Sequence, residues 1–201
     1  MYRILMTTQH IGKYACLEVE RRYLMNKIPA ELLDKPQGWL ITDRYFPDTR
    51  LRLRYMQSVA GKEKIYKLTQ KYRSEIQKPY ETTITNLYLT EAEYDHLKVL
   101  EAKVLQKRRY LHKASRRTFS IDVFEGRHQG LILAEIELEN QSEADQVVLP
   151  SFALGDVTAD PFFTGGNLAA MTDQEFQQGL SQHLCDHENY QAKTPPTKAR
   201  R

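Results

Sequence analysis

Residues 16–24 (CLEVERRYL) alternate charged and apolar side chains, and this pattern constrains the fold more than any other part of the chain. Successive side chains of a β-strand point to opposite faces, so Glu18, Glu20 and Arg22 would share one surface. Burying unpaired ions in an apolar core costs several kcal/mol per ion. This face must therefore meet water, a metal, an anion or other charges, and on a single strand a solvated face is the simpler explanation.

Several later segments repeat the alternation, and eight strands are predicted in all. These predicted strands are residues 16–24, 39–46, 50–57, 64–72, 80–89, 107–113, 117–125 and 131–139. Their charged positions collect Glu18, Glu20, Glu81, Asp122, Glu135 and Glu137, together with Arg22, Arg52, Arg54, Lys67, Lys71, Lys107 and Arg109. The two signs are segregated by strand, which random solvated faces would not favour.

Capping patterns predict two clear helices between and after these strands. Thr90 with Glu93 and Thr172 with Glu175 each form a capping box, and Ser142 is the predicted cap of a third, shorter helix. Eight mostly antiparallel strands with amphipathic helices predict an α+β fold. We expect an eight-stranded antiparallel β-barrel with flanking helices, because closure removes exposed sheet edges.

Length and composition indicate one soluble domain. With 201 residues and 41% hydrophobic content the chain can bury a sizeable core, and no apolar run approaches the ~20 residues that span a bilayer. The N-terminus lacks a signal-peptide pattern, so a cytoplasmic protein without a membrane partner is predicted. A net charge of +3 is too small to indicate a nucleic-acid partner, and Cys16 and Cys185 are too few for a disulfide framework. The expected parts are an N-terminal extension (1–14), a barrel domain (15–190) and a disordered basic tail (191–201).

Two arrangements of such a barrel remain open from the alternation alone. In one, Leu17, Leu53, Leu68, Ile121 and Ile136 fill the interior and the charges are solvated outside. In the other, the charges line a wet tunnel and the apolar faces lie beneath helices. A tunnel would suit a metal-bound polyanion, because carboxylates suit a hard cation and several arginines and lysines suit phosphate oxygens. On this argument the two arrangements are equally supported.

The order of the charged segments resembles the CYTH family, the triphosphate tunnel metalloenzymes, along most of the chain. EVERR at 18–22 is similar to the Glu-x-Glu-x-Lys signature of that family. Further similar pieces are RLRLR at 50–54, KLTQK at 67–71, KRRY at 107–110, SIDVF at 120–124, AEIE at 134–137 and DVTADPFFTGGNLA at 156–169. The resemblance implies an eight-stranded antiparallel tunnel.

The resemblance also implies the site. Metal ligands would be Glu18, Glu20, Glu135 and Glu137, and the cofactor Mg²⁺ or Mn²⁺. Phosphate-binding residues would be Arg22, Arg52, Arg54, Lys67, Lys71 and Arg109, of which Lys71 and Arg109 would act in catalysis together with Glu20. Three departures stand out: Arg22 replaces the signature Lys, Thr83 replaces the second Glu of a pair beginning at Glu81, and Pro161, Phe162 and Gly166 stand where basic residues are usual.

The predicted function is metal-dependent hydrolysis of tripolyphosphate or another triphosphate-containing small molecule. One alternative is a binding module that holds a phosphorylated ligand without cleaving it, favoured by the missing terminal basic residues. A class IV-like adenylate cyclase is another, although no residue pattern indicates adenine recognition. The sequence leaves the physiological substrate, the preferred metal and the oligomeric state open.

Overall fold

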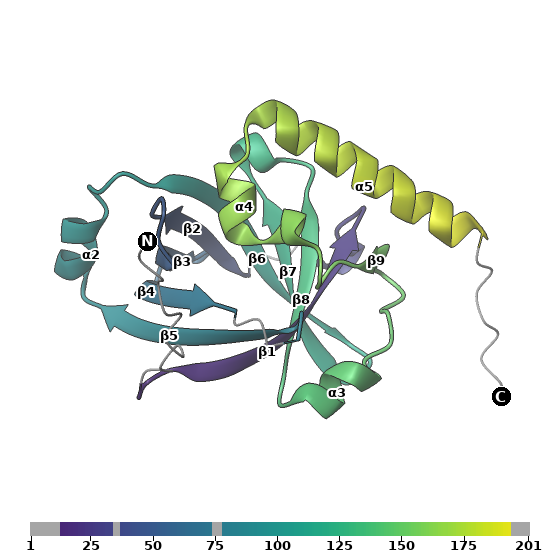
Figure 1. Ribbon diagram of the computed structural model, residues 1–201, viewed down its shortest axis with the longest axis horizontal. Helices are drawn as coiled ribbons and strands as arrows, with labels where there is room; N and C mark the ends of the chain where they lie inside the picture. Colours follow the sequence, from purple (N-terminus) through teal and green to yellow (C-terminus); the bar gives the residue numbers. More distant parts are fainter. Residues whose placement is uncertain (1–12, 34–36, 74–77, 194–201) are drawn as a thin grey trace, which may run out of the picture.

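Eight antiparallel strands form a closed barrel in the computed structural model, which describes residues 13–33, 37–73 and 78–193. The strands follow one another in the order β5-β4-β3-β2-β6-β7-β8-β1, and β1 pairs back with β5 (Figure 1). They are β1 (Cys16–Met25), β2 (Trp39–Tyr45), β3 (Leu51–Ser58), β4 (Lys64–Tyr72), β5 (Glu81–Leu89), β6 (Lys103–Ala114), β7 (Arg117–Phe124) and β8 (Ile132–Leu138). The predicted α+β class and eight-stranded antiparallel barrel are confirmed.

Short helices and turns flank the barrel, and one long helix extends beyond it. The two-residue strand β9 (Gly155–Asp156) pairs with Tyr23 and Leu24, near the C-terminal end of β1. The helices are α1 (Ala30–Leu33), α2 (Glu91–Leu97), α3 (Gln141–Gln146), α4 (Gly165–Ala170) and α5 (Asp173–Lys193), with 3₁₀ turns η1 (Gly126–His128) and η2 (Pro161–Phe163). Within the described residues no helix is long and apolar enough to cross a membrane.

Side-chain caps begin α2 and α5 where the sequence predicts them. At α2, Thr90 and Glu93 form the reciprocal capping box. At α5, the Glu175 carboxylate accepts from the Thr172 backbone N–H at 2.7 Å, and Thr172 Oγ1 accepts from the Glu175 N–H at 3.3 Å. The cap of α3 differs from the prediction: Asn140, not Ser142, accepts from the third backbone N–H of the helix. Asn is as good a cap as Ser and stands two residues earlier.

One apolar core lies outside the barrel wall. Tyr23, Phe119, Ile121 and Ile136 point outward from β1, β7 and β8 and are at most 3% exposed. They pack with residues of α1 and of the segment around Phe152. Charged faces therefore point inward, and the tunnel arrangement, not the solvated one, is the correct alternative.

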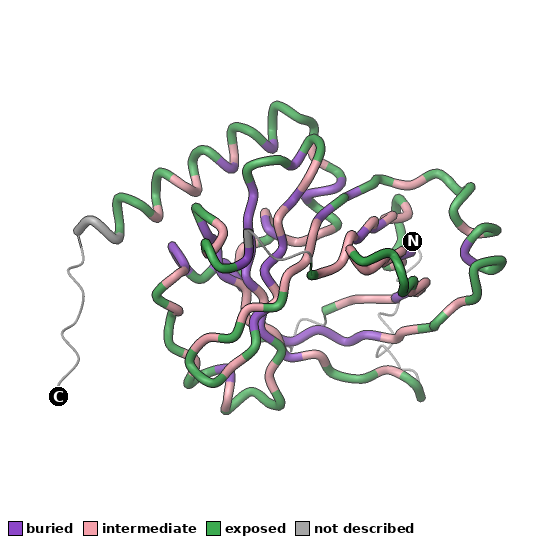
Figure 2. The backbone as a smooth tube through the Cα atoms, turned by 180° about the vertical axis from the view of Figure 1, so that it is seen from behind, coloured by how far each residue is buried: buried purple, intermediate pink, exposed green. Residues whose placement is uncertain are grey.

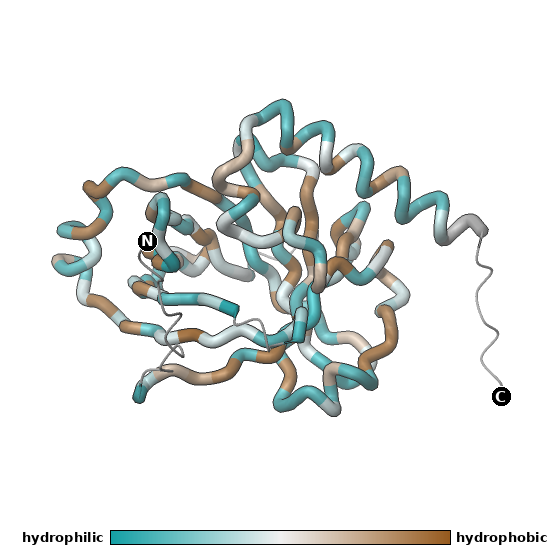
Figure 3. The backbone as a smooth tube through the Cα atoms, in the orientation of Figure 1, coloured by the Kyte–Doolittle hydropathy of each residue, from teal (hydrophilic) through white to brown (hydrophobic). Residues whose placement is uncertain are grey.

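A second apolar cluster fills one end of the barrel interior. Leu24, Leu105, Phe124 and Leu133 point inward from four strands and meet side chains of η2, α4 and α5. Figure 1 shows α4 lying over this end and α5 running away from it. Beyond this contact α5 is mostly exposed and hydrophilic (Figures 2 and 3).

One predicted inward residue faces the other way. Glu81 is 3% exposed but does not line the interior, because Thr82, Ile84 and Asn86 are the β5 residues that do. Alternation fixes which residues of a strand share a face but not which of the two faces is inside. The prediction that Glu81 belongs to the charged interior is therefore wrong.

The described residues include only some of the predicted boundaries between extension, domain and tail. Helix α5 continues to Lys193, three residues past the expected end of the domain at 190. Most of the predicted N-terminal extension (1–14) and of the predicted tail (191–201) lies outside the described residues. Cys16 and Cys185 are both free, as expected for a chain without a disulfide framework.

We predict that Gly38→Ala destabilises the barrel. Gly38 has φ +129° just before β2, and a Cβ there would lie 2.4 Å from the backbone oxygen of Arg109. The free energy of unfolding should fall by at least about 1 to 3 kcal/mol, measured by urea denaturation. Gly166→Ala is the control, because its Cβ would make only an ordinary 3.9 Å contact. Equal stability of the two variants would contradict the assigned backbone at Gly38.

Candidate active site

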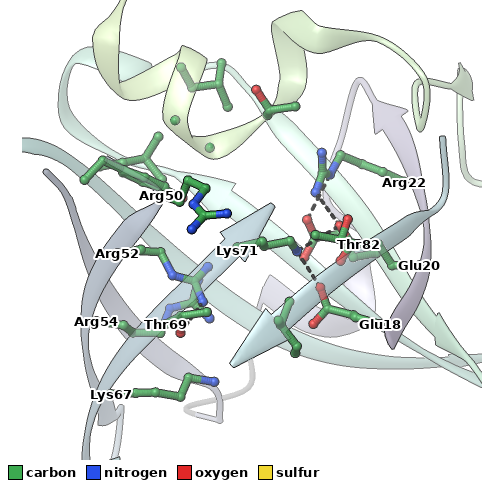
Figure 4. Close-up of a pocket in the computed structure, with 18 of the residues that line it drawn as sticks. Glu18, Glu20, Arg22, Arg50, Arg52, Arg54, Lys67, Thr69, Lys71 and Thr82 are labelled. Atoms are coloured by element: carbon green, nitrogen blue, oxygen red, sulfur yellow. Dashed lines mark hydrogen bonds and ion pairs between the residues drawn. The ribbon is translucent and has the colours of Figure 1, made fainter. Parts of the chain in front are cut away.

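A cavity of about 480 Å³ occupies the polar part of the barrel interior (Figure 4). Strands on all sides contribute to it, and among the described residues more arginine and lysine than carboxylate side chains line it. Its charged lining residues are Glu18, Glu20, Arg22, Arg50, Arg52, Arg54, Lys67, Lys71, Arg73, Lys107, Arg109, Glu135 and Glu137. Every residue predicted for metal or phosphate binding therefore lies on one cavity.

The acidic side of the cavity is formed by β1 and β8. Glu20 stands directly opposite Glu137 in the antiparallel pairing, and Glu18 follows on the same face of β1. The Lys71 ammonium, reaching across from β4, bonds Glu18 and lies 3.3 Å from Glu20 Oε1 (Figure 4). Burial opposes the charge on Lys71, but the two carboxylates outweigh it and raise its pKa.

Arg22 connects this acidic side to the C-terminal segment. Its guanidinium donates to Glu20 and Glu135, each at 2.9 Å, and to the backbone oxygen of Phe163 at 3.0 Å. A lysine has no planar fork with which to make this set of bonds. The departure from the signature at this position thus fixes η2 beside the cavity.

Glu135 lies between two guanidinium groups. Oε1 accepts from Arg22 and Oε2 accepts from Arg109 at 2.7 Å. Burial disfavours its ionised form, but the charges of Arg22, Lys107 and Arg109 outweigh that cost and hold the pKa of Glu135 well below its usual range. Both oxygens are therefore engaged by cations of the protein.

Two buried aspartates hold the deepest arginines. Asp122, fully buried on β7, accepts two bonds from Arg109 at 2.6 and 2.7 Å and one from Lys107 at 2.5 Å. Asp43, fully buried on β2, accepts two bonds from Arg54 at 2.6 and 2.7 Å. Bidentate hydrogen bonding of this kind fixes a guanidinium in both position and orientation.

The cationic side of the cavity is only partly neutralised. Arg52 reaches Thr69 Oγ1 at 3.2 Å, while its Nε is 3.6 Å from Asp43 and has no hydrogen-bond partner. Within the described residues no ion pair is formed by Lys67, which lies 5.9 Å from the Tyr88 ring centroid. Burial, together with the charges of Arg54 and Arg52, lowers the pKa of Lys67 to about 8.

Three charged residues of this arrangement, Asp43, Arg50 and Arg73, are not among the residues predicted from the sequence. For Asp43 the signal was present, because alternation along β2 (WLITDRY) puts Asp43 on the same face as Ile41 and Tyr45. Apolar and aromatic neighbours hid it, since this strand carries no run of alternating charges.

The carboxylates suit a hard divalent cation by their chemistry. Glu18, Glu20 and Glu137 offer oxygen ligands from adjacent strand positions, and like charges directly opposite one another are unfavourable without a cation between them. Across the described part of the chain, however, no three acidic, histidine or cysteine side chains are already grouped to hold a metal. The Lys71 ammonium supplies a positive charge between Glu18 and Glu20.

Comparison with known proteins finds similarity in structure but not in sequence. No protein-family model and no curated protein matches the sequence. The crystal structure of the inorganic triphosphatase NE1496 matches with a TM-score of 0.51 and 23% identity, over 77% of this chain and 95% of that chain. A second crystal structure of NE1496, described as a hypothetical protein, gives 0.52 and 24%, over 77% and 98%. The chain has the CYTH-type tunnel fold.

Another match, the PH1819 protein from Pyrococcus horikoshii OT3, has a TM-score of 0.43 and 16% identity over 86% of this chain and 89% of that chain.

Within the CYTH-type fold, this chain differs from the family pattern at the terminal segment. There Thr164, Gly165, Gly166 and Leu168 line the cavity without adding a charge. Gly165 is required for this packing, because a Cβ would lie 1.9 Å from the Tyr45 hydroxyl oxygen.

We predict that Lys67 makes anion binding depend on pH. A folded-state pKa of about 8, below the ordinary 10.5, means that the ammonium is charged at neutral pH and loses its charge above about pH 8. Tripolyphosphate affinity, measured by calorimetry without metal, should therefore decline at higher pH by at most about tenfold per pH unit. Lys67→Arg stays charged and should lack this decline. Taking the ratio of the two affinities at each pH cancels the ionisation of the ligand itself, and a constant ratio would contradict the prediction.

Proposed function

We propose that this protein hydrolyses tripolyphosphate or a triphosphate-containing small molecule inside the barrel cavity. The observation that carries the proposal is the segregation of charge within one cavity: carboxylates of β1 and β8 face arginines and lysines of β3, β4 and β6. A polyphosphate chain with a bound cation has matching charges, negative along its oxygens and positive at the metal. The inorganic triphosphatase activity named for NE1496 is consistent with this but belongs to that protein.

The cationic side chains would bind and orient the phosphate chain. Arg54 and Arg109 are held by buried aspartates, so they would present donors in fixed positions. Arg52 and Lys67 retain unsatisfied donors or charge and would close on phosphate oxygens. Catalysis of phosphoryl transfer is mainly positioning and charge stabilisation, and this set supplies both.

A divalent cation, Mg²⁺ or Mn²⁺, would be held by Glu18, Glu20 and Glu137, with Glu135 keeping Arg22 and Arg109 in place beside it. When bound, the cation would neutralise charge on the phosphate oxygens. Water would be the nucleophile, and tripolyphosphate plus water would give phosphate and diphosphate. Lys71 and Arg109 would stabilise the charge that develops on the transferred group.

A second candidate is binding without cleavage. Two observations favour it: the uncharged lining from the terminal segment, and the absence of a preformed metal-binding group among the described residues. Phosphate release from tripolyphosphate, ATP and thiamine triphosphate, each with Mg²⁺ and with a chelator, distinguishes the two. Metal-dependent release supports hydrolysis, whereas tight binding without release supports the binding module.

We predict that Glu18→Gln and Glu20→Gln each abolish metal-dependent turnover. The amide keeps the shape of the side chain but loses the charge that a hard cation requires. Circular dichroism should show that both variants stay folded, and activity should drop to the rate seen with chelator. Glu63→Gln is the matched control, because Glu63 is exposed in the β3–β4 turn. Wild-type rates in the two cavity variants would refute the metal assignment.

We also predict a selective thermal stabilisation by ligand. A ligand at a hundredfold excess over its Kd stabilises the folded state by about 2.7 kcal/mol, and about 2 to 4 °C per kcal/mol applies at this size. Tripolyphosphate with Mg²⁺ should thus raise Tm by several degrees in differential scanning fluorimetry. Sulfate with Mg²⁺ at equal ionic strength controls for screening, and equal shifts would mean that the cavity does not select polyphosphate.

A further inference from the structure

Asp43 is a fully buried acid directly behind the cationic side of the cavity. Burial opposes its ionisation, but the charges of Arg54 and Arg52 outweigh burial and hold its pKa well below the usual range. It is therefore a carboxylate at every pH at which the protein would work. Asp43 does not itself line the cavity, so any effect on a ligand must pass through Arg52 and Arg54, which do.

The two arginines beside Asp43 are held very differently. Arg54 gives its Nε and Nη2 to the two carboxylate oxygens, at 2.6 and 2.7 Å. Arg52 comes no nearer than 3.6 Å, and its Nε is buried without any hydrogen-bond partner. One guanidinium is thus fixed, whereas the other keeps a donor that nothing in the described protein satisfies.

We propose that Asp43 is a positioning residue that fixes Arg54 and leaves Arg52 unfixed, so that the Arg52 guanidinium can turn toward an oxygen of a bound phosphate. This inference rests on the proposed function, which it deepens by dividing the cationic side into a fixed and an adjustable arginine. The asymmetry supports a ligand-directed role. A carboxylate placed only for stability would be expected to pair both cations, because buried donors without acceptors are unfavourable.

The same carboxylate influences Lys67. The charged groups acting on Lys67 are Arg54 and Arg52 from β3, which lower its pKa, and Glu18 from β1 and Asp43 from β2, which raise it. The Tyr88 ring of β5 lies beside its ammonium. Removing the Asp43 charge should therefore move the loss of Lys67 charge to lower pH, while making the cavity more positive at neutral pH.

The test compares Asp43→Asn with a control, Asp95→Asn. Asp95 is an exposed aspartate on α2 whose one ion pair within the described residues is with the exposed Lys98. With tripolyphosphate and Mg²⁺, Asp43→Asn should lower kcat by about tenfold or more, because misplacing a positioned group weakens the transition state. Asp95→Asn should keep the wild-type kcat. A smaller loss of kcat in Asp43→Asn, or an equal loss in Asp95→Asn, would overturn the proposal.

A binding experiment keeps this inference separate from the proposed function. Calorimetric affinity for tripolyphosphate without metal should begin to decline at lower pH in Asp43→Asn than in wild type and Asp95→Asn. If wild type binds but releases no phosphate, the hydrolase proposal fails, and this shift alone decides the role of Asp43. An unchanged pH dependence overturns the role.

Nuclear magnetic resonance of the wild-type protein covers the case in which Asp43→Asn does not fold. The Nε–H signal of Arg54 should be rigid, and that of Arg50 mobile, since Arg50 rests on the Tyr72 ring and has no carboxylate partner in the described structure. Adding tripolyphosphate should shift and rigidify Nε–H of Arg52 specifically. An Arg54 signal as mobile as that of Arg50, or an Arg52 signal that does not respond, would overturn the proposal.

Discussion

Pairing of opposite charges inside the closed barrel is the interaction on which the rest of the structure depends. Cations on several strands point into one interior, where they would repel one another strongly without counter-ions. Asp43, Asp122 and Glu135 supply those counter-ions, each bonded to at least one arginine. Removing one partner of such a buried pair costs about 3 to 5 kcal/mol, so the polar interior is a structural element as well as a candidate site.

A charged interior forces the apolar residues elsewhere, and this explains the remaining architecture. The outward faces of β1, β7 and β8 must be covered, and α1 and the segment around Phe152 help to cover them. The barrel end that carries Leu24, Leu105 and Phe124 is closed by η2, α4 and α5. The helices are therefore needed to complete two separate cores around the charged cavity.

The cavity is organised by ion pairs within the protein, but not uniformly. Arg54 and Arg109 are fixed by two-point bonds, whereas Arg52 and Lys67 keep unsatisfied capacity. The fixed donors of Arg54 and Arg109 would define the position of a bound anion. Arg52 and Lys67 would add binding free energy by forming new contacts with it. The CYTH-type tunnel fold shared with NE1496 places the strands around the cavity. The arginine–carboxylate pairs of this chain determine which donors inside it are available to a phosphate chain.

Sequence patterns by themselves determined the strands, the caps of α2 and α5 and the residues that share each charged face, because these depend on local geometry with a period of two or on neighbouring residues. Several features were decided only by the tertiary structure. They include the outward direction of Glu81, the pairing of Asp43 with Arg54 and the insertion of Lys71 between Glu18 and Glu20. The physical reason is that register between strands and closure of the barrel set which side chains meet across the interior, and a single strand carries no information about its partner.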